Sequence, residues 1–403
     1  MTAVAGSTIS VAYIYKHRYS DRQATEIALR DHPTFFAIPK EGNLDGIDFN
    51  YNITTGNPQG ISNTFAAAQS AAETLKGVQP AAVPLTKYGD LVLDGPSMMR
   101  ARGGRASFYD LITRSQDGIL DELGADIAFN LQRDTSGMRG RRASISGNVV
   151  TLTNVRDVEH FKRGMTIVAS TSSVGSSVRS GTSKVVGLNR TNKTITLDDQ
   201  STITGFADND YLFRSGATGQ TGIEGMDTCT PLAVPTAGDS FRGFDRSVDA
   251  EALAGSRIDD TSRYPEEIIG DIAVEVSIIG KKCESACVFP STFQAMVKRL
   301  GAKVEFMPGA TVEVGFEYIV LITAGGQLKV MSDPDTDYSR VRLWRNDTHC
   351  IKHMDELVHL IRDDGRPNLR TATTDGLETR ARFLGNYIQY DPSSHGVGST
   401  AAT

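Results

Sequence analysis

The 403-residue chain has few cysteines, no excess of basic residues and no long apolar run. Its four cysteines (Cys229, Cys283, Cys287 and Cys350) lack the spacing of a disulfide framework or of a CxxC motif. We therefore expect small buried thiols, no structural disulfide and a reducing compartment. Lys and Arg number 42 against 48 Asp and Glu, a formal net charge of −6 that argues against a dedicated nucleic-acid-binding protein.

Membrane and secretion signals are also missing. No stretch approaches the roughly 20 apolar residues that a membrane-spanning helix needs. The N-terminal sequence MTAVAGSTISVAYIYK has no basic region ahead of an apolar run, so we expect no membrane association and no secretion.

The signatures of common enzyme classes are absent as well. The sequence contains no GxxxxGK[ST], no GxGxxG after a strand, no GxSxG and no HExxH. Phosphate-binding loops, dinucleotide-binding turns, hydrolase nucleophile elbows and zinc-protease helices therefore have no support. We expect a protein that is not an enzyme and that holds no cofactor or metal.

One group of residues has the types that bind zinc. His349 and Cys350 are followed by His353 and His359. The segment 344–353 has the pattern of a strand, in which alternation sends neighbouring side chains to opposite faces. We expect core or surface histidines here, and we keep a metal-dependent enzyme as an alternative of a different class.

A second group imitates a calcium loop. Asp333, Asp335 and Asp337 match its first three ligands, but Tyr338 stands where glycine is needed and Trp344 where a bidentate glutamate is needed. We predict a turn between two strands.

The clearest local signal is a long amphipathic helix over 107–133. Ser107 and Asp110 form a capping-box pattern at its start. Apolar residues follow at three- and four-residue steps, which indicates one buried stripe: Phe108, Leu111, Ile112, Ile119, Leu123, Ile127 and Leu131. Four acidic residues are predicted to fall largely off that stripe: Asp117, Asp121, Glu122 and Asp126.

Two glycines lie inside this helix. Gly118 and Gly124 each cost about 1 kcal/mol relative to alanine. They favour either close packing or a place where the helix bends, and tolerated glycines in an ordinary core helix are the alternative.

Directly before the helix, the sequence predicts an apolar β ribbon within 61–104. Leu91, Val92 and Leu93 form its centre, and three further apolar residues flank it: Tyr88, Met98 and Met99. A two-stranded projection cannot bury this much apolar surface against itself, so we expect a partner surface there.

The rest of the chain divides into three further parts. Residues 1–60 are predicted to be an extended arm with one short helix that Pro33 ends. After a flexible basic joint at 136–142, short strands and turns predict an all-β insertion over 148–214. Within it, 170–183 has the composition of a mobile loop.

The remaining residues, 215–403, are predicted to form an α+β domain. Helices are expected over 265–280 and 290–301, and strands over 286–289, 312–316, 318–322, 327–331 and 340–344. The strands are expected to pair mostly as antiparallel hairpins. We expect the tail after Pro392 to be loose.

Six arginines lie near the two ends of the long helix: Arg100, Arg102, Arg105, Arg139, Arg141 and Arg142. They suit salt bridges to acidic residues of a neighbouring subunit. Contacts with phosphates that do not read sequence are the alternative.

The order of these parts resembles the major capsid protein of tailed bacteriophages, the Hong Kong 97-type fold. The stretch 59–95, QGISNTFAAAQSAAETLKGVQPAAVPLTKYGDLVLDG, is similar to the extended loop of that family, and 107–137 is similar to its spine helix. The stretches 265–280, 288–300 and 326–349 are similar to the core of its axial and peripheral domains. The resemblance covers roughly residues 40–395 and lies in the order and spacing of the parts.

The resemblance implies an α+β fold with five parts: an N-terminal arm (1–60), an extended loop (61–104), the spine helix with the start of the peripheral domain (105–147), an all-β insertion (148–214), and the axial and remaining peripheral domain (215–403). It implies a shell subunit that forms pentamers and hexamers of an icosahedral head around double-stranded DNA, assembled in the bacterial cytoplasm and found in the virion. A bacterial encapsulin-like compartment shell is the close alternative.

Family features also set expectations for contacts and partners. Tyr88, Leu91, Leu93, Met98 and Met99 would touch a neighbouring copy, and packing beneath their own subunit is the alternative for Leu91, Met98 and Met99. The spine helix would bend at its two glycines. Because the arm is short, we expect a separate scaffolding protein, together with a portal and non-specific contact with the packaged DNA. The insertion either stabilises the capsomer or docks a decoration protein. Some relatives crosslink a ribbon lysine, but Lys76 and Lys87 have no identifiable partner, so no crosslink is predicted.

Overall fold

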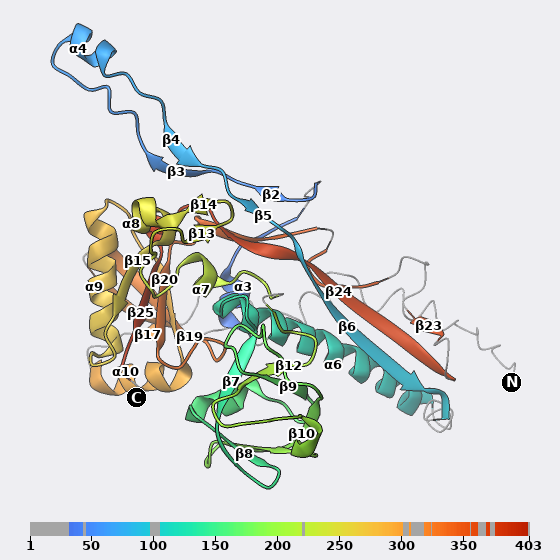
Figure 1. Ribbon diagram of the computed structural model, residues 1–403. Coiled ribbons are helices and arrows are strands. Elements are labelled where there is room, and N and C mark those ends of the chain that lie inside the picture. The colour runs from blue at the N-terminus through green and yellow to red at the C-terminus, as the bar shows by residue number, and fades with distance from the viewer. Residues whose placement is uncertain are drawn as a thin grey trace, which may run out of the picture.

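The computed structural model describes residues 32–42, 46–96, 105–219, 222–300, 306–307, 318–323, 325–354, 356–361, 368–370 and 375–401. The expected helix before Pro33, the strand at 312–316, and Met98, Met99, Arg100 and Arg102 lie outside these residues, as does the side chain of Arg105. A long helix lies under a pair of long strands, with a ribbon, a barrel and a seven-stranded sheet arranged around them (Figure 1).

The long helix is α6, Arg105–Gln132, which confirms the predicted helix within two residues at each end. Leu123, Ile127 and Leu131 are buried, as the apolar stripe predicts for its second half, whereas Ile119 is half-buried and its neighbour Leu120, which lies outside the predicted stripe, is fully buried. The prediction for Asp126 is wrong, because this carboxylate is also buried. The C-terminal half of α6 is enclosed on more than one face, and a stripe calculated from apolar residues alone does not reveal that.

The strand β6, Leu85–Asp94, pairs antiparallel with β24, Gly376–Gln389, from Asp94 opposite Gly376 to Leu85 opposite Gly385. The two strands belong to a six-stranded sheet with β1 (Lys40–Glu41), β21 (His349–His353), β22 (His359–Leu360) and β23 (Asn368–Arg370). The prediction that 88–93 form the projecting ribbon is therefore wrong. Their partner strand lies near the other end of the chain, and local pattern does not show such a pairing.

The projecting ribbon lies earlier in the chain than predicted. It consists of β2 (Phe49–Asn50) paired with β5 (Ala81–Ala82) and β3 (Ile53–Gly56) paired with β4 (Lys76–Val78). The short helix α4, Phe65–Ser70, lies at its far end, away from the body of the molecule (Figure 1). The boundary predicted at residue 60 thus cuts through the ribbon, which spans 49–82.

The insertion is a closed six-stranded barrel in the order β10-β11-β8-β7-β12-β9. Its strands are β7 (Met138–Ser146), β8 (Val149–Leu152), β9 (Thr166–Ser170), β10 (Ser183–Asn189), β11 (Thr194–Leu197) and β12 (Tyr211–Arg214). The all-β prediction is confirmed, but the expected basic joint at 136–142 is mostly strand β7. Its three arginines concealed the strand, because they carry charge in positions where a strand usually shows apolar residues.

The C-terminal part is a mixed seven-stranded sheet in the order β15-β25-β20-β16-β19-β18-β17. Its strands are Ser256–Asp259, Gly396–Ser399, Arg340–Trp344, Ser285–Val288, Gly326–Ser332, Tyr318–Thr323 and Phe306–Met307, in that order. The predicted helices are confirmed as α9 (Pro265–Ile278) and α10 (Pro290–Leu300). The expectation of mostly antiparallel pairing is confirmed, since β20 pairs antiparallel with β16 and β25, and β18 pairs antiparallel with β17 and β19; β15 with β25 and β16 with β19 are the parallel pairs of this sheet.

The remaining elements are short. They are α3 (Pro33–Ala37), α7 (Met226–Cys229), α8 (Ala250–Ala254), the pair β13 (Ser240–Phe241) and β14 (Phe244–Asp245), and the 3-10 helices η1 (Val155–His160), η2 (Gln200–Thr202), η3 (Arg246–Asp249) and η5 (Pro392–Ser394). All four cysteines are buried and free, as expected. Among the described residues, no helix is both long and apolar enough to cross a bilayer.

The C-terminal tail is not loose, contrary to the prediction. Strand β25 lies between β15 and β20, and its residues are buried. A Cβ built on Gly396 would come 2.2 Å from Cγ2 of Ile272, and one on Gly398 would come 2.4 Å from Cγ2 of Ile268, both on α9. Glycine at these two positions lets the helix lie directly on the strand, which is why the tail has so few apolar residues.

We predict that Gly396→Ala lowers the free energy of unfolding by about 1–3 kcal/mol, because the added methyl overlaps Ile272. Urea denaturation of the full chain measures this change. Gly270→Ala is the matched control: it lies in α9 with no atom within 4 Å of a built Cβ, and a glycine-to-alanine change within a helix should stabilise by up to about 1 kcal/mol. Equal effects of the two variants would contradict the close packing of β25 on α9.

Candidate functional site

The ribbon presents apolar side chains that its own strands do not cover. Ile61 is 86% exposed and Phe65 is 82% exposed, and α4 buries none of its residues. A two-stranded projection has no core in which to place them. The apolar surface that needs a partner molecule therefore lies at the far end of this ribbon, at Ile61 and Phe65.

The base of the ribbon is fixed to the body. Phe49, Ile53 and Ala82 are buried together with Leu253 and Ile388 of the body. The exposed end therefore projects from a well-packed base, the root of the ribbon.

A hydrogen-bonded arginine strengthens this root. Arg242 donates from Nη1 to the Tyr51 hydroxyl at 2.6 Å and from Nη2 to the Tyr387 carbonyl at 2.8 Å. Its Nε bonds Glu224 at 2.9 Å. One side chain thus connects the start of the ribbon to β24.

The second candidate surface is the face of β6 that points away from α6. Tyr88 is 69% exposed and Val92 is 53% exposed on this face. Leu91 and Leu93 lie on the opposite face, together with Gly89, whose built Cβ would come 3.0 Å from Cγ1 of Ile119 on α6. Leu91 and Leu93 are half-buried and belong to the subunit's own interior side. Tyr88 stays a predicted assembly contact.

The centre of the molecule is a buried charge cluster around Asp126 of α6. Its Oδ2 lies 3.1 Å from Lys87 Nζ on β6, and its Oδ1 lies 3.2 Å from Arg214 Nη1 on β12. Arg139 of β7 also forms an ion pair with Oδ1, and its guanidinium lies 4.3 Å from the centre of the Phe129 ring. Burial alone raises the pKa of the Asp126 carboxyl, but these three cations outweigh it and lower the pKa to about 2.

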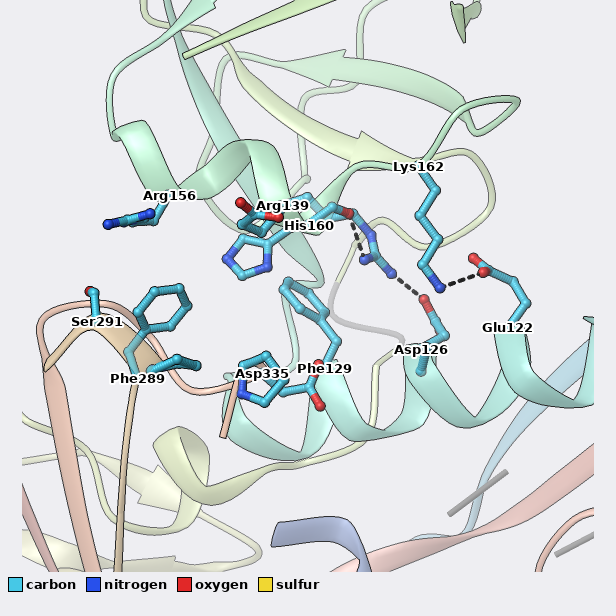
Figure 2. A pocket seen from close by; sticks show the side chains of 14 residues that line it. Glu122, Asp126, Phe129, Arg139, Arg156, His160, Lys162, Phe289, Ser291 and Asp335 are labelled. Carbon is cyan, nitrogen blue, oxygen red and sulfur yellow. Dashed lines mark hydrogen bonds and ion pairs between the residues drawn. The ribbon is translucent and has the colours of Figure 1, made fainter. Parts of the chain in front are cut away.

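A neighbouring acid extends the cluster. Glu122, one turn earlier on α6, pairs at 2.7 Å with Lys162 of the barrel (Figure 2). It also pairs with Arg214 of β12. The ribbon-bearing strand, the long helix and the barrel are thus connected through two carboxylates. The sequence did not predict that Asp126 and Lys87 form a buried ion pair. The available signal was a group of acidic residues in the helix, followed by the arginines of β7.

This cluster decides the role of the predicted basic residues. Arg139 is buried with Asp126, and Arg142 is buried against Phe206 with an ion pair to Asp208 at 3.0 Å. Their prediction as contacts with a neighbour or with DNA is wrong, because both charges are neutralised within the subunit. Arg141 is half-exposed beside Tyr211, so its predicted role is still open.

The predicted hinge glycines differ in their surroundings. Gly118 is exposed, and a Cβ built on it meets no atom within 4 Å, so close packing does not explain it. Gly124 lies in the buried half of α6. A bend of α6 at these positions stays a prediction.

The zinc candidates do not converge. His349 Nδ1 lies 3.2 Å from the Tyr387 hydroxyl, whereas the Cys350 Sγ lies 3.3 Å from the Tyr390 hydroxyl. Burial lowers the pKa of His349 well below its usual value, so this imidazole is neutral. Within the described ranges, no three His, Cys, Asp or Glu side chains are placed to hold a metal.

The three aspartates that resemble a calcium loop also do not converge on one site. Asp333 accepts from the Thr34 amide at 3.2 Å, Asp335 pairs with His32 at 2.6 Å, and Asp337 pairs with Arg133 at 3.0 Å. The three carboxylates have different partners in a turn between β19 and β20. The turn prediction is confirmed.

We predict that Asp126→Asn lowers the free energy of unfolding at neutral pH by about 3–5 kcal/mol, because it leaves buried cations unpaired. The pKa of this carboxyl is lower in the folded chain than its ordinary 3.8, so its contribution is present above about pH 4 and is lost as the pH falls towards 2. Urea denaturation as a function of pH should show the gap between the wild-type and variant curves narrowing there, by about 2–2.5 kcal/mol for a pKa shift from 3.8 to about 2. The exposed barrel variant Asp198→Asn serves as the control and should follow the wild type at every pH; a constant gap between wild type and Asp126→Asn would contradict this assignment.

Comparison with solved structures shows the fold. The capsid protein in the asymmetric unit of cyanophage A-1(L) superposes with a TM-score of 0.53 at 10% identity, over 93% of this chain and 94% of that one. A chain of a Mycobacterium phage Adephagia structure (TM-score 0.43, 8% identity, 100% and 99% coverage) and a chain of the holo-SrpI encapsulin complex of Synechococcus elongatus (0.45, 6%, 100% and 92%) are more distant.

The sequence itself matches no protein-family model and no curated protein. The cyanophage superposition covers nearly the whole of both chains. This chain therefore has the α+β fold of a phage capsid protein.

Proposed function

We propose that this chain is the major capsid protein of a tailed bacteriophage, with the Hong Kong 97-type fold. Copies of it assemble into pentamers and hexamers of an icosahedral head around double-stranded DNA. The capsid-protein fold supports the class of function. The observation that carries the proposal is the ribbon 49–82, which holds exposed Ile61 and Phe65 away from the body on a packed root.

In the proposed shell, the ribbon of one copy lies on the open face of the β6–β24 pair of the next copy. That face offers Tyr88 and Val92 beside a row of charges, since Asp90 is opposite Arg380 and Val92 is opposite Glu378. Apolar centres bordered by charges are typical of protein interfaces. Complete burial of a side chain such as Phe65 contributes about 1.5–3 kcal/mol, and a closed shell repeats the contact in every subunit.

The proposal includes several partners and a location. A separate scaffolding protein and a portal take part in assembly in the bacterial cytoplasm, and the finished protein is in the virion. Contact with DNA is non-specific, consistent with a net charge of −6 and no basic excess. The barrel either stabilises the capsomer or docks a decoration protein. No catalytic activity is proposed.

We predict that Phe65→Asp and Tyr88→Asp each give a folded subunit that does not close a shell, because each places a charge in one side of the proposed contact. Negative-stain electron microscopy of the purified variants, alone or with scaffold, should show unassembled subunits or open fragments where the wild type forms shells. Circular dichroism should match the wild type for both.

Leu91→Asp provides the matched comparison, because Leu91 lies next to this surface in sequence but faces α6. It should lower the unfolding midpoint of the isolated subunit, as expected for a charge placed against the helix. If Tyr88→Asp formed normal shells, the proposed docking face would be wrong.

The hinge in α6 has its own test. Replacing Gly118 and Gly124 together by Ala should slow shell expansion, because alanine stiffens the helix. Light scattering or time-resolved electron microscopy of maturing shells measures the rate. Expansion at the wild-type rate would exclude the hinge.

A further inference from the structure

A cavity of about 360 Å³ lies where the long helix, the barrel and the start of α10 meet (Figure 2). Three parts of the chain form its wall: Phe129 and its neighbours on α6, the segment 156–162 of the barrel, and 289–291 together with 334–335 beside the seven-stranded sheet. The proposed shell contacts do not use this space. A group bound in this cavity would therefore affect how the barrel packs against the rest of the subunit.

The carboxylates that line the cavity already have basic side chains as partners. Asp126 and Glu122 belong to the charge cluster, Glu159 pairs with Arg190 at 2.7 Å, and Asp335 pairs with His32 at 2.6 Å. The lining cations Arg139 and Lys162 are the partners of Asp126 and Glu122.

Arg156 differs from the other cations of the wall. Its guanidinium carbon lies 5.8 Å from the centre of the Phe289 ring and 5.9 Å from that of Tyr338, and within the described residues no carboxylate forms an ion pair with it. Its Nε is buried without an acceptor, and the nearby Ser291 hydroxyl is also buried without a partner. A buried guanidinium Nε and a buried hydroxyl in the wall of one cavity, both without a partner, indicate an absent group, either ordered water or an ion.

We propose that this cavity binds a small oxyanion of the phosphate type at Arg156 and Ser291. An arginine supplies several donors in the geometry that phosphate oxygens accept. The amides of the first turn of α10, which begins at Pro290, add favourable dipoles on the same side. A long polyanion is disfavoured, because Glu122, Glu159 and Asp335 also line the cavity.

The bound anion would connect η1 of the barrel to the start of α10. These two segments lie on opposite sides of the cavity (Figure 2). Its binding should therefore stabilise the position of the barrel relative to the seven-stranded sheet. A ligand that binds only the folded chain raises the unfolding temperature, and its stabilising free energy grows with the logarithm of its concentration once that concentration exceeds the dissociation constant.

The test titrates inorganic phosphate into the purified full-length chain at constant ionic strength, with calorimetry for affinity and thermal unfolding for stability. The wild type should bind one phosphate and gain thermal stability. Arg156→Met should bind at least about tenfold more weakly, as expected for loss of a charge-assisted contact. Arg156→Lys should retain part of the affinity.

Arg163→Met is the matched control, because Arg163 lies in the same segment of the barrel, is exposed and does not line the cavity. It should bind phosphate as the wild type does. If Arg156→Met does not fold, Ser291→Ala provides the second measurement and should weaken binding without loss of structure.

Three results would overturn the proposal. In the first, the wild type binds no phosphate, which would mean that water alone fills the cavity. In the second, Arg156→Met binds phosphate as tightly as the wild type. In the third, a single-stranded oligonucleotide binds through Arg156 more tightly than free phosphate does.

Discussion

The antiparallel pairing of β6 with β24 is the constraint on which the rest of the structure depends. It joins residues 85–94 to residues 376–385 and lays both strands along α6 (Figure 1). The ribbon enters the body through β5, immediately before β6, and Phe49 and Ala82 at its root are buried beside Ile388, near the end of β24. One ladder therefore sets both the direction of the ribbon and the face that is available to a neighbour.

The buried cluster around Asp126 adds the barrel to this frame. Lys87 comes from the strand, Arg139 and Arg214 come from the barrel, and the carboxylate comes from the helix. A buried ion pair is a weak source of net stability but is strongly destabilising when one partner is removed. We infer that the cluster serves mainly to position β6, α6 and the barrel relative to one another, because side chains from all three meet at Asp126.

The sequence allowed prediction of the elements with strong local periodicity. The stripes of α6 and α9, the strands of the barrel core and the turn at Asp333 follow from spacing and turn residues alone. Pairings between distant segments did not follow, because β6 has the same local pattern whether it pairs with a hairpin neighbour or with β24. Strand β25 was missed because close contact with Ile272 requires glycine at 396, which removes the apolar signal. At the candidate site, Tyr88 stays a predicted contact. The buried role of Asp126 was not predicted, since a buried charge looks like a surface residue until its cations are located.

The central claim is that the ribbon of one copy lies on the β6–β24 face of the next. Cryo-electron microscopy of particles assembled from the purified chain, with scaffold where assembly requires it, measures this contact directly. We expect a closed lattice of pentamers and hexamers in which density for Phe65 and its neighbours lies against an adjacent subunit. Particles in which the ribbon touches no other copy, or a chain that stays monomeric under all assembly conditions, would contradict it.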